Sequence, residues 1–380
     1  MSEVINYGIV GCGMMGQEHA RNIAHLPDAL VSAIFEPDAQ MAEAARAAVP
    51  AARMHESLAG FLADPGIDCL VIASPNQLHA AQFEAIARTR PLPLLIEKPL
   101  YTRPTDAKRI LGLAEEYPAP VWVGMEYRYM PPIKSFIEEL DDATGGPTML
   151  TIREHRFPFL HKVGDWNRFN RNTGGTLVEK CCHFFDLMRH ILGGEPERVM
   201  ASAGQDVNHL NEDYGGETPD IWDGAYVIVE FDNGCRAMLE LCMYADGSDY
   251  QEELTAVGPK GKIEARVPGP PRFWPERLGS PPRPQVVVSP REPRGSRSVD
   301  IPIDPELQAI GDHNGATYYQ HVRFLEMLRN GGEPEVRLRD GARAVEMGHA
   351  AQEAAAKGKV VHLQDVTLME QDVSRKGATG

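Results

Sequence analysis

Short apolar runs alternate with amphipathic stretches along about the first 125 residues of the chain. The apolar runs lie at residues 7–10, 30–35, 69–73, 92–96 and 121–124. Each is short and is followed by turn residues, which is typical of buried strands. Between them, helical patterns begin near residue 15 and cover residues 41–48, 79–88 and 105–116. Strands that alternate with helices predict an α/β fold with a doubly wound parallel sheet.

After residue 130 the pattern changes to longer strands in which apolar and polar residues alternate. These strands are expected at residues 149–153, 199–203, 225–231, 235–244 and 252–257, with a short one at 360–363. Such alternation predicts a mostly antiparallel sheet with one solvated face. Helices are expected at residues 176–192 and 341–357. Residues 268–293 are crowded with prolines and arginines, so we expect an irregular excursion at a sheet edge, an oligomer arm or a lid, and not a central strand.

Three glycines stand between the first strand and the first helix. Gly11 permits a tight turn, Gly13 lets backbone approach a diphosphate, and Gly16 lets the helix lie close to the strand. Met14 and Met15 open the helix whose free N–H groups would hold that diphosphate. A tight connection without a ligand is the alternative. The strand before the glycines and the helix after them favour a dinucleotide-binding site of the Rossmann type.

Glu36 follows the second strand, 20 residues beyond Gly16. A carboxylate in this place accepts hydrogen bonds from a ribose 2′-hydroxyl. Asp38 adds a second negative charge, and no basic residue follows before Arg46. Because two carboxylates would repel a 2′-phosphate, the sequence predicts NAD as the cofactor in preference to NADP.

The two patterns divide the chain into two expected domains. Residues 1–125 form a Rossmann domain, and residues 126–365 form an α+β domain with a large, mostly antiparallel open sheet. The helix at 341–357 is expected to pack back on the first domain, and residues 366–380 to form a polar tail. A chain of 380 residues is long enough to bury two cores.

Composition narrows the range of partners. The net charge of −16 disfavours nucleic acid and anionic membrane surfaces as partners. No apolar run reaches the roughly 18 residues of a membrane helix, and the first strand begins too early for a signal peptide, so we expect a cytoplasmic protein. The six cysteines lack the spacing of a zinc site, so we expect reduced thiols and no metal.

The first candidate for chemistry is a lysine at the end of a strand. Glu97 and Lys98 follow the apolar run at 92–96, and Pro99 stops the strand. Ligand crevices of open α/β sheets lie at the carboxyl ends of the strands, where a nicotinamide would be bound. A lysine on a solvated loop is the alternative.

The second candidate is the helix expected at 176–192, which is apolar on most sides. It keeps Glu179, His183, Asp186 and His190 on one narrow stripe. Burying such groups costs free energy that structure alone seldom requires. Asp186 and His190 could be satisfied core groups, and Glu179 could cap the helix together with Thr176.

These candidates together predict the oxidation of a secondary alcohol. His183 would take the hydroxyl proton, because imidazole titrates near neutral pH. Lys98 would stabilise the negative charge that develops on the oxygen while hydride passes to NAD. Glu179 would orient His183 or Lys98.

Polar and aromatic residues near these groups are candidates for substrate contact. They are Tyr127, Arg128, His155, Trp166, Arg168 and Asn170, together with Lys98, Glu179 and His183. An aromatic face beside planar hydrogen-bond donors suits a ring with several hydroxyls, whereas a polar loop that shields the cleft is the alternative. With no phosphate or acyl site in evidence, we expect an unphosphorylated inositol or pyranose.

Five motifs, in this order, resemble those of the Gfo/Idh/MocA family of NAD(P)-dependent sugar and inositol oxidoreductases. They are GCGMMG at 11–16, SPNQLH at 74–79, EKP at 97–99, MEYRYMPP at 125–132 and GGTLVEKCCHFFD at 174–186. The resemblance implies that Lys98 and His183 are the family's lysine and histidine. It extends the expected cofactor site to Ser74, Pro75, Asn76, His79 and Glu97.

In one position the chain departs from the family pattern. The acidic residue four before the histidine is usually Asp, and Glu179 moves that carboxylate outward by one methylene. The resemblance also implies that the second sheet serves in assembly of a homodimer or homotetramer. Three other functions stay open: a glycoside-processing enzyme that uses transient oxidation, an NAD-binding regulator without turnover, and a metal-dependent hydrolase.

Overall fold

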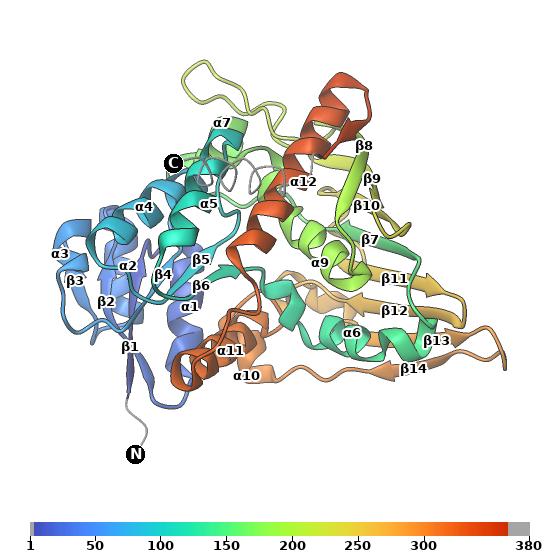
Figure 1. The fold of residues 1–380 in the computed structure, drawn as a ribbon, viewed down its shortest axis with the longest axis horizontal. Coiled ribbons are helices and arrows are strands. Elements are labelled where there is room, and N and C mark those ends of the chain that lie inside the picture. The colour runs from blue at the N-terminus through green and yellow to red at the C-terminus, as the bar shows by residue number, and fades with distance from the viewer. Residues whose placement is uncertain (1–3, 364–380) are drawn as a thin grey trace, which may run out of the picture.

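The computed structural model describes residues 4–363, and two sheets form its framework (Figure 1). The first sheet has the strand order β3-β2-β1-β4-β5-β6, and its neighbouring strands pair in parallel. Its strands are β1 (Ile5–Val10), β2 (Ala29–Phe35), β3 (Arg53–His55), β4 (Cys69–Ile72), β5 (Leu94–Glu97) and β6 (Val121–Gly124). Its helices are α1 (Met14–Ala24), α2 (Ala39–Ala48), α3 (Leu58–Leu62), α4 (His79–Thr89) and α5 (Ala107–Glu116). The predicted doubly wound parallel sheet is confirmed.

The second sheet has the order β14-β13-β12-β11-β7-β10-β9-β8-β15 among the described residues. Its strands are β7 (Met149–His155), β8 (Pro196–Gly204), β9 (Gly224–Phe231), β10 (Arg236–Cys242), β11 (Glu252–Gly258), β12 (Gly261–Val267), β13 (Gln285–Pro290), β14 (Arg297–Asp300) and β15 (Val361–His362). Among the described strands of this second sheet, only β7 and β10 pair in parallel. The sheet is therefore mostly antiparallel, as predicted.

Helices cover one face of the second sheet. They are α6 (Pro131–Thr144), α9 (Cys182–Leu192) and α12 (Leu338–Lys357). The remaining helices are α7 (Asn170–Thr173), α8 (Thr176–Glu179), α10 (Pro305–Ile310) and α11 (Ala316–Asn330). In the part of the chain that is described, no helix combines the length and the apolar character needed to cross a bilayer.

The expectation for residues 268–293 was partly wrong. The segment contains two short 3-10 turns, but β13 within it pairs with β12 on one side and β14 on the other. The reason is local, because the prolines at 281, 282 and 284 end before residue 285 and residues 285–289 contain none. Every N–H of that apolar stretch is therefore available for pairing.

The helix expected at 176–192 is divided into α8 and α9 by a turn at Lys180 and Cys181. The hydroxyl of Thr176 donates to the carbonyl of Trp222 at 2.6 Å and does not cap the helix with Glu179. Lys180 turns toward the second sheet, where its ammonium lies 2.8 Å from a Glu154 carboxylate oxygen on β7.

The long helix α12 lies against elements of both sheets (Figure 1). At Gly341 a Cβ would meet Val123 of β6, and at Gly348 it would lie 2.7 Å from the carbonyl oxygen of Leu177 in α8. We propose that the domain boundary falls at residues 125–126, directly after β6. The polar tail expected at 366–380 lies outside the described residues.

We predict that Gly348→Ala destabilises the protein by about 1–3 kcal/mol, because the backbone of α8 occupies the space of the new methyl group. Helix propensity alone would give the opposite sign, by up to about 1 kcal/mol. Gly112→Ala is the matched control. Gly112 lies inside α5, where a new Cβ would meet no other residue within 4 Å, so this substitution should stabilise the protein. Urea unfolding measures both. Equal stabilisation by the two substitutions would refute this packing.

Candidate active site at the carboxyl ends of the parallel strands

A cavity of about 450 Å³ opens at the carboxyl ends of the parallel strands. Of the residues predicted to hold the cofactor, its wall includes Gly11, Gly13, Met14, Met15, Glu36, Ser74, Pro75, Asn76, His79, Glu97 and Lys98. Gly16 lies beneath, where a Cβ would be 2.2 Å from the carbonyl oxygen of Gly11. Only glycine permits this approach of α1 to the turn.

The glycine turn has room for a dinucleotide. Gly11 has a φ of 84°, and a Cβ there would lie 2.5 Å from Ser74 Cα, whereas a Cβ at Gly13 would meet nothing within 4 Å. Glu36 lies against this turn, where it accepts hydrogen bonds from the N–H groups of Cys12, at 2.6 Å, and Asp38, at 2.9 Å. Open backbone at Gly13 and a fixed carboxylate beside the turn fit a diphosphate and the ribose next to it.

A loop that follows β7 forms the facing wall of this cavity. It contributes His161, Lys162, Val163 and Trp166. The Lys162 ammonium lies 4.5 Å from the Trp166 ring centre and 3.4 Å from Glu179 Oε1. Among these four, the sequence singled out only Trp166. Lys162 was missed because a lone lysine in an irregular loop carries no periodic signal.

Lys98 connects the first sheet with the helices of the second. Its ammonium donates to the backbone carbonyl of Glu179 at 3.4 Å. Burial opposes the charge, but Cys182, Glu97 and Glu179 outweigh it and raise the pKa of Lys98. Glu97 in turn lies 2.9 Å from His19. Lys98 is therefore an ammonium ion at neutral pH.

His183 lies deeper than the cavity wall and is only 2% exposed. Its imidazole stacks on the ring of Tyr127, with ring centres 4.0 Å apart and planes 7° from parallel. Burial, followed by the charges of Lys98 and Lys180, holds the pKa of His183 well below its usual value. The ring is therefore neutral at pH 7 and able to accept a proton.

The predicted stripe of Glu179, His183, Asp186 and His190 does not act as one group. Asp186 receives two hydrogen bonds from the Arg128 guanidinium, at 2.5 and 2.6 Å, in a buried ion pair. His190 lies at the edge of a different, shallower cavity. Of the four, Glu179 bonds to Lys98 through its backbone carbonyl, and His183 lies near enough for the charge of Lys98 to lower its pKa.

Three of the residues predicted to contact substrate are engaged with other side chains, away from the cofactor cavity. Arg128 is engaged with Asp186, the buried Arg168 pairs with Glu212 at 2.9 Å, and Asn170 bonds to Asp220 through its N–H and its amide. None of them lines the cofactor cavity. Their polar groups hold neighbouring loops, because a buried guanidinium needs a carboxylate partner.

His155 lies on the face of the second sheet that is turned away from the buried Glu154 and the helices. Side chains alternate along β7, so that Glu154 is buried while His155 is directed to the half-exposed face. There it lies 3.0 Å from Glu240 of β10. His155 therefore lies away from the cofactor cavity, on the face of the sheet opposite to Glu154.

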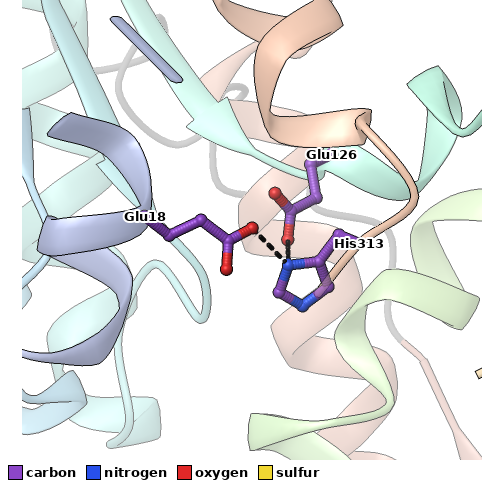
Figure 2. A group of neighbouring side chains, drawn as sticks. All are labelled: Glu18, Glu126 and His313. Atoms are coloured by element: carbon purple, nitrogen blue, oxygen red, sulfur yellow. Dashed lines mark hydrogen bonds and ion pairs between the residues drawn. The ribbon is translucent and has the colours of Figure 1, made fainter. Parts of the chain in front are cut away.

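A buried cluster that the sequence did not reveal joins α1, the 3-10 turn η3 (Glu126–Tyr129) and the loop before α11 (Figure 2). His313 Nδ1 lies 2.9 Å from a Glu18 oxygen and 3.6 Å from a Glu126 oxygen. The hydroxyl of Thr317 lies within hydrogen-bonding distance of both carboxylates. The donor atoms of the three residues lie within 4.8 Å of one another, so their types could hold a cation.

Charges within this cluster compensate one another. Burial disfavours the imidazolium of His313, but Glu126 and Glu18 raise its pKa to about 9. Burial would also raise the pKa of Glu18, yet His313 lowers it to about 2. The three residues are 108 or more positions apart in the chain, and no local motif signals such a grouping.

Comparisons with known proteins agree with this architecture. Residues 5–125 match the model of the oxidoreductase family's NAD-binding Rossmann fold, and residues 140–363 match its C-terminal alpha/beta domain. The chain is 24% identical to the myo-inositol 2-dehydrogenase of Thermotoga maritima over 369 residues, which covers 94% of this chain and 98% of that protein. It is 29% identical to inositol 2-dehydrogenase 2 of Saccharopolyspora erythraea over 267 residues, 70% of this chain and 74% of the relative.

Solved structures show the same fold. A levoglucosan dehydrogenase, in complex with NADH and levoglucosan, superimposes with a TM-score of 0.78 at 21% identity, covering 96% of this chain and 100% of that one. GenD2 of gentamicin A biosynthesis, in complex with NAD, gives 0.76 at 21% identity, with 96% and 97% covered. With both family models spanning most of its length, the chain belongs to the Gfo/Idh/MocA family of oxidoreductases and carries that family's NAD-binding Rossmann fold.

Proposed function

We propose that this oxidoreductase is an NAD-dependent dehydrogenase that oxidises a ring secondary hydroxyl of an inositol or a pyranose sugar or glycoside. Two observations support the proposal. Lys98 lines the dinucleotide cavity and donates to the carbonyl of Glu179 in α8 at 3.4 Å. His183 follows four residues later in α9, near enough for the charge of Lys98 to lower its pKa. The inositol dehydrogenases among the relatives support this substrate class.

The two side chains divide the work on the substrate hydroxyl. His183, neutral because it is buried among cations, accepts the hydroxyl proton. The Lys98 ammonium donates a hydrogen bond to the same oxygen and stabilises its growing negative charge. Glu179 keeps Lys98 in place through its backbone carbonyl and engages Lys162 through its carboxylate. NAD bound in the cavity would supply the hydride acceptor.

The cofactor preference follows from Glu36. Its carboxylate lines the cavity and is fixed by two backbone N–H groups, so a 2′-phosphate placed there would meet a negative charge that cannot swing away. We therefore propose NAD over NADP.

We predict at least a tenfold higher kcat/KM with NAD than with NADP. Glu36→Gln should narrow that ratio, because it removes the charge and keeps the shape. Initial rates with both cofactors measure the effect. A wild-type enzyme that prefers NADP would contradict the role given to Glu36.

Lys98→Met and His183→Asn should each lower kcat by roughly a hundredfold or more, while NAD binding by titration changes little for His183→Asn. Lys108→Met, at an exposed lysine of α5, is the control and should leave both unchanged. The formation of reduced nicotinamide, measured with a panel of inositols, pyranoses and glycosides, gives kcat for each variant.

The same panel separates the remaining functions. A keto product from an intact glycoside supports simple dehydrogenation, whereas cleavage of the glycosidic bond would support the glycoside-processing alternative. NAD binding without turnover of any compound would support a regulator. Activity lost on treatment with chelators would support a metal-dependent reaction.

We also propose that the half-exposed face of the second sheet joins two copies of the chain. Large apolar side chains lie on this face in neighbouring strands, where sheet residues of a lone subunit would meet water. They are Met149, Tyr226, Ile228, Met238 and Val257. Cross-strand pairing places Ile228 beside Met238, and Met149 beside Val257, so that two apolar pairs lie in adjacent rows of the same face.

Ile228→Glu should convert the oligomer to monomers, because a carboxylate would be buried unpaired in the interface. Leu30→Glu is the control, since Leu30 is 42% exposed on the first sheet and Ile228 is 43% exposed on the second. Light scattering coupled to gel filtration gives the mass. A wild-type monomer, or an oligomer that survives Ile228→Glu, would refute the interface.

A further inference from the structure

A buried lysine stands next to the proposed catalytic groups without any role so far. Lys180 lies in the turn between α8 and α9 and is 5% exposed. Its ammonium donates to the phenol oxygen of Tyr127 at 2.5 Å and lies 2.8 Å from Glu154 Oε1. Lysine is rarely buried so completely, and the free energy of desolvating it must be offset by these partners.

Tyr127 connects this lysine with His183. The phenol ring is 2% exposed and stacks in parallel on the imidazole, and it meets the ring of Phe184 edge to face. No hydrogen bond from the described residues reaches His183 Nδ1, which is buried. The orientation of the imidazole therefore depends on the ring that covers it.

We propose that Lys180 is a positioning residue for His183: its ammonium anchors the Tyr127 ring that fixes the imidazole, and places a positive charge behind it. The inference rests on the proposed role of His183 as proton acceptor. Lys180 does not line the cofactor cavity, and its contact with Tyr127 is the path by which it acts on His183.

The electrostatic part of the proposal depends on every charge near the imidazole. The cations that act on His183 come from four separate segments: Lys98 after β5, Lys180 between the helices, Arg156 after β7 and His313 before α11. All four oppose protonation of the ring, in addition to burial. Removing one of them should make the imidazole easier to protonate.

Two carboxylates stand behind Lys180 and must be included in this account. Glu154 and Glu252 are paired across β7 and β11, and both are buried. Burial and the nearby Glu154 raise the pKa of Glu252 to about 7, while Arg156 lies 3.7 Å from Glu154. Lys180 is thus the ion that separates these carboxylates from the Tyr127 hydroxyl.

Three substitutions separate the anchoring of Tyr127 from the effect of the Lys180 charge. Lys180→Gln keeps a hydrogen-bond donor for Tyr127 and removes the charge, whereas Lys180→Met removes both. Tyr127→Phe keeps the stacked ring and the charge but removes the hydroxyl that Lys180 holds.

The decisive measurement is an NMR titration of the His183 Cε1–Hε1 signal, assigned by its loss in His183→Asn. Lys180→Gln and Lys180→Met should raise the pKa of His183 by about one unit, and Tyr127→Phe should shift it much less. The acid limb of the kcat/KM profile for alcohol oxidation should move upward by the same amount, because only the neutral ring accepts a proton.

The effect of anchoring Tyr127 is measured by kcat at pH values above the acid limb, where His183 is neutral in all variants. Lys180→Met and Tyr127→Phe should lose about tenfold or more, and Lys180→Gln should recover most of the rate through its amide. A purely structural lysine would lower kcat in both Lys180 variants without moving the acid limb.

Lys180→Met leaves Glu154 without its partner, so that variant could fail to fold. Lys180→Met combined with Glu154→Leu removes both charges and keeps the titration measurable. An unchanged His183 titration in folded Lys180→Gln overturns the proposal, and so does a double variant that keeps the wild-type kcat, because it has lost the anchor of Tyr127. The NMR titration needs no substrate, so it can test the role of Lys180 even if the protein oxidises no alcohol. If the enzyme oxidises an alcohol but the pKa of His183 does not change in Lys180→Gln, the role of Lys180 is refuted and the proposed function is not.

Discussion

Burying a charged side chain without a partner costs on the order of several kcal/mol, and the region between the two sheets buries many such side chains. These side chains find polar or charged partners on other segments of the chain. Lys98 meets α8, Lys180 meets β7, and His313 meets both Glu18 and Glu126 (Figure 2). Because these partners come from both sheets, pairing the charges also sets how the two halves of the chain meet.

These surrounding charges also set the protonation states of the two proposed catalytic groups. Against the effect of burial, Cys182 and nearby carboxylates raise the pKa of Lys98, whereas burial and nearby cations lower the pKa of His183. Two groups of opposite protonation state beside one cavity are what the oxidation of an alcohol requires. No metal ion is needed in this account, since the ammonium supplies the positive charge for the oxygen.

Local sequence patterns predicted those features of the structure that are set by residues close together in the chain. The glycines at 11, 13 and 16, the carboxylate of Glu36 and the lysine after β5 all lie where the order of strand, turn and helix places them. The division into a parallel and a mostly antiparallel sheet followed from the period of the apolar positions.

What the sequence could not predict depends on pairings across long distances. His155 was assigned to the site, yet the register of β7 directs it to the other face of the sheet. Arg128 was read as a substrate contact, but Asp186, 58 residues away, engages it. Lys162 and Lys180 gave no periodic signal, because each is a single cation whose partner comes from another segment.

The central claim is that Lys98 and His183 converge on one oxygen at the reactive carbon of a bound nicotinamide. A crystal structure of the protein with NAD and a poorly oxidised polyol tests it most directly. The account predicts one substrate hydroxyl within about 3.5 Å of both Lys98 Nζ and a His183 ring nitrogen, with its carbon facing the nicotinamide C4. A bound polyol whose nearest hydroxyl reaches Lys98 but stays beyond about 6 Å from the imidazole would contradict it.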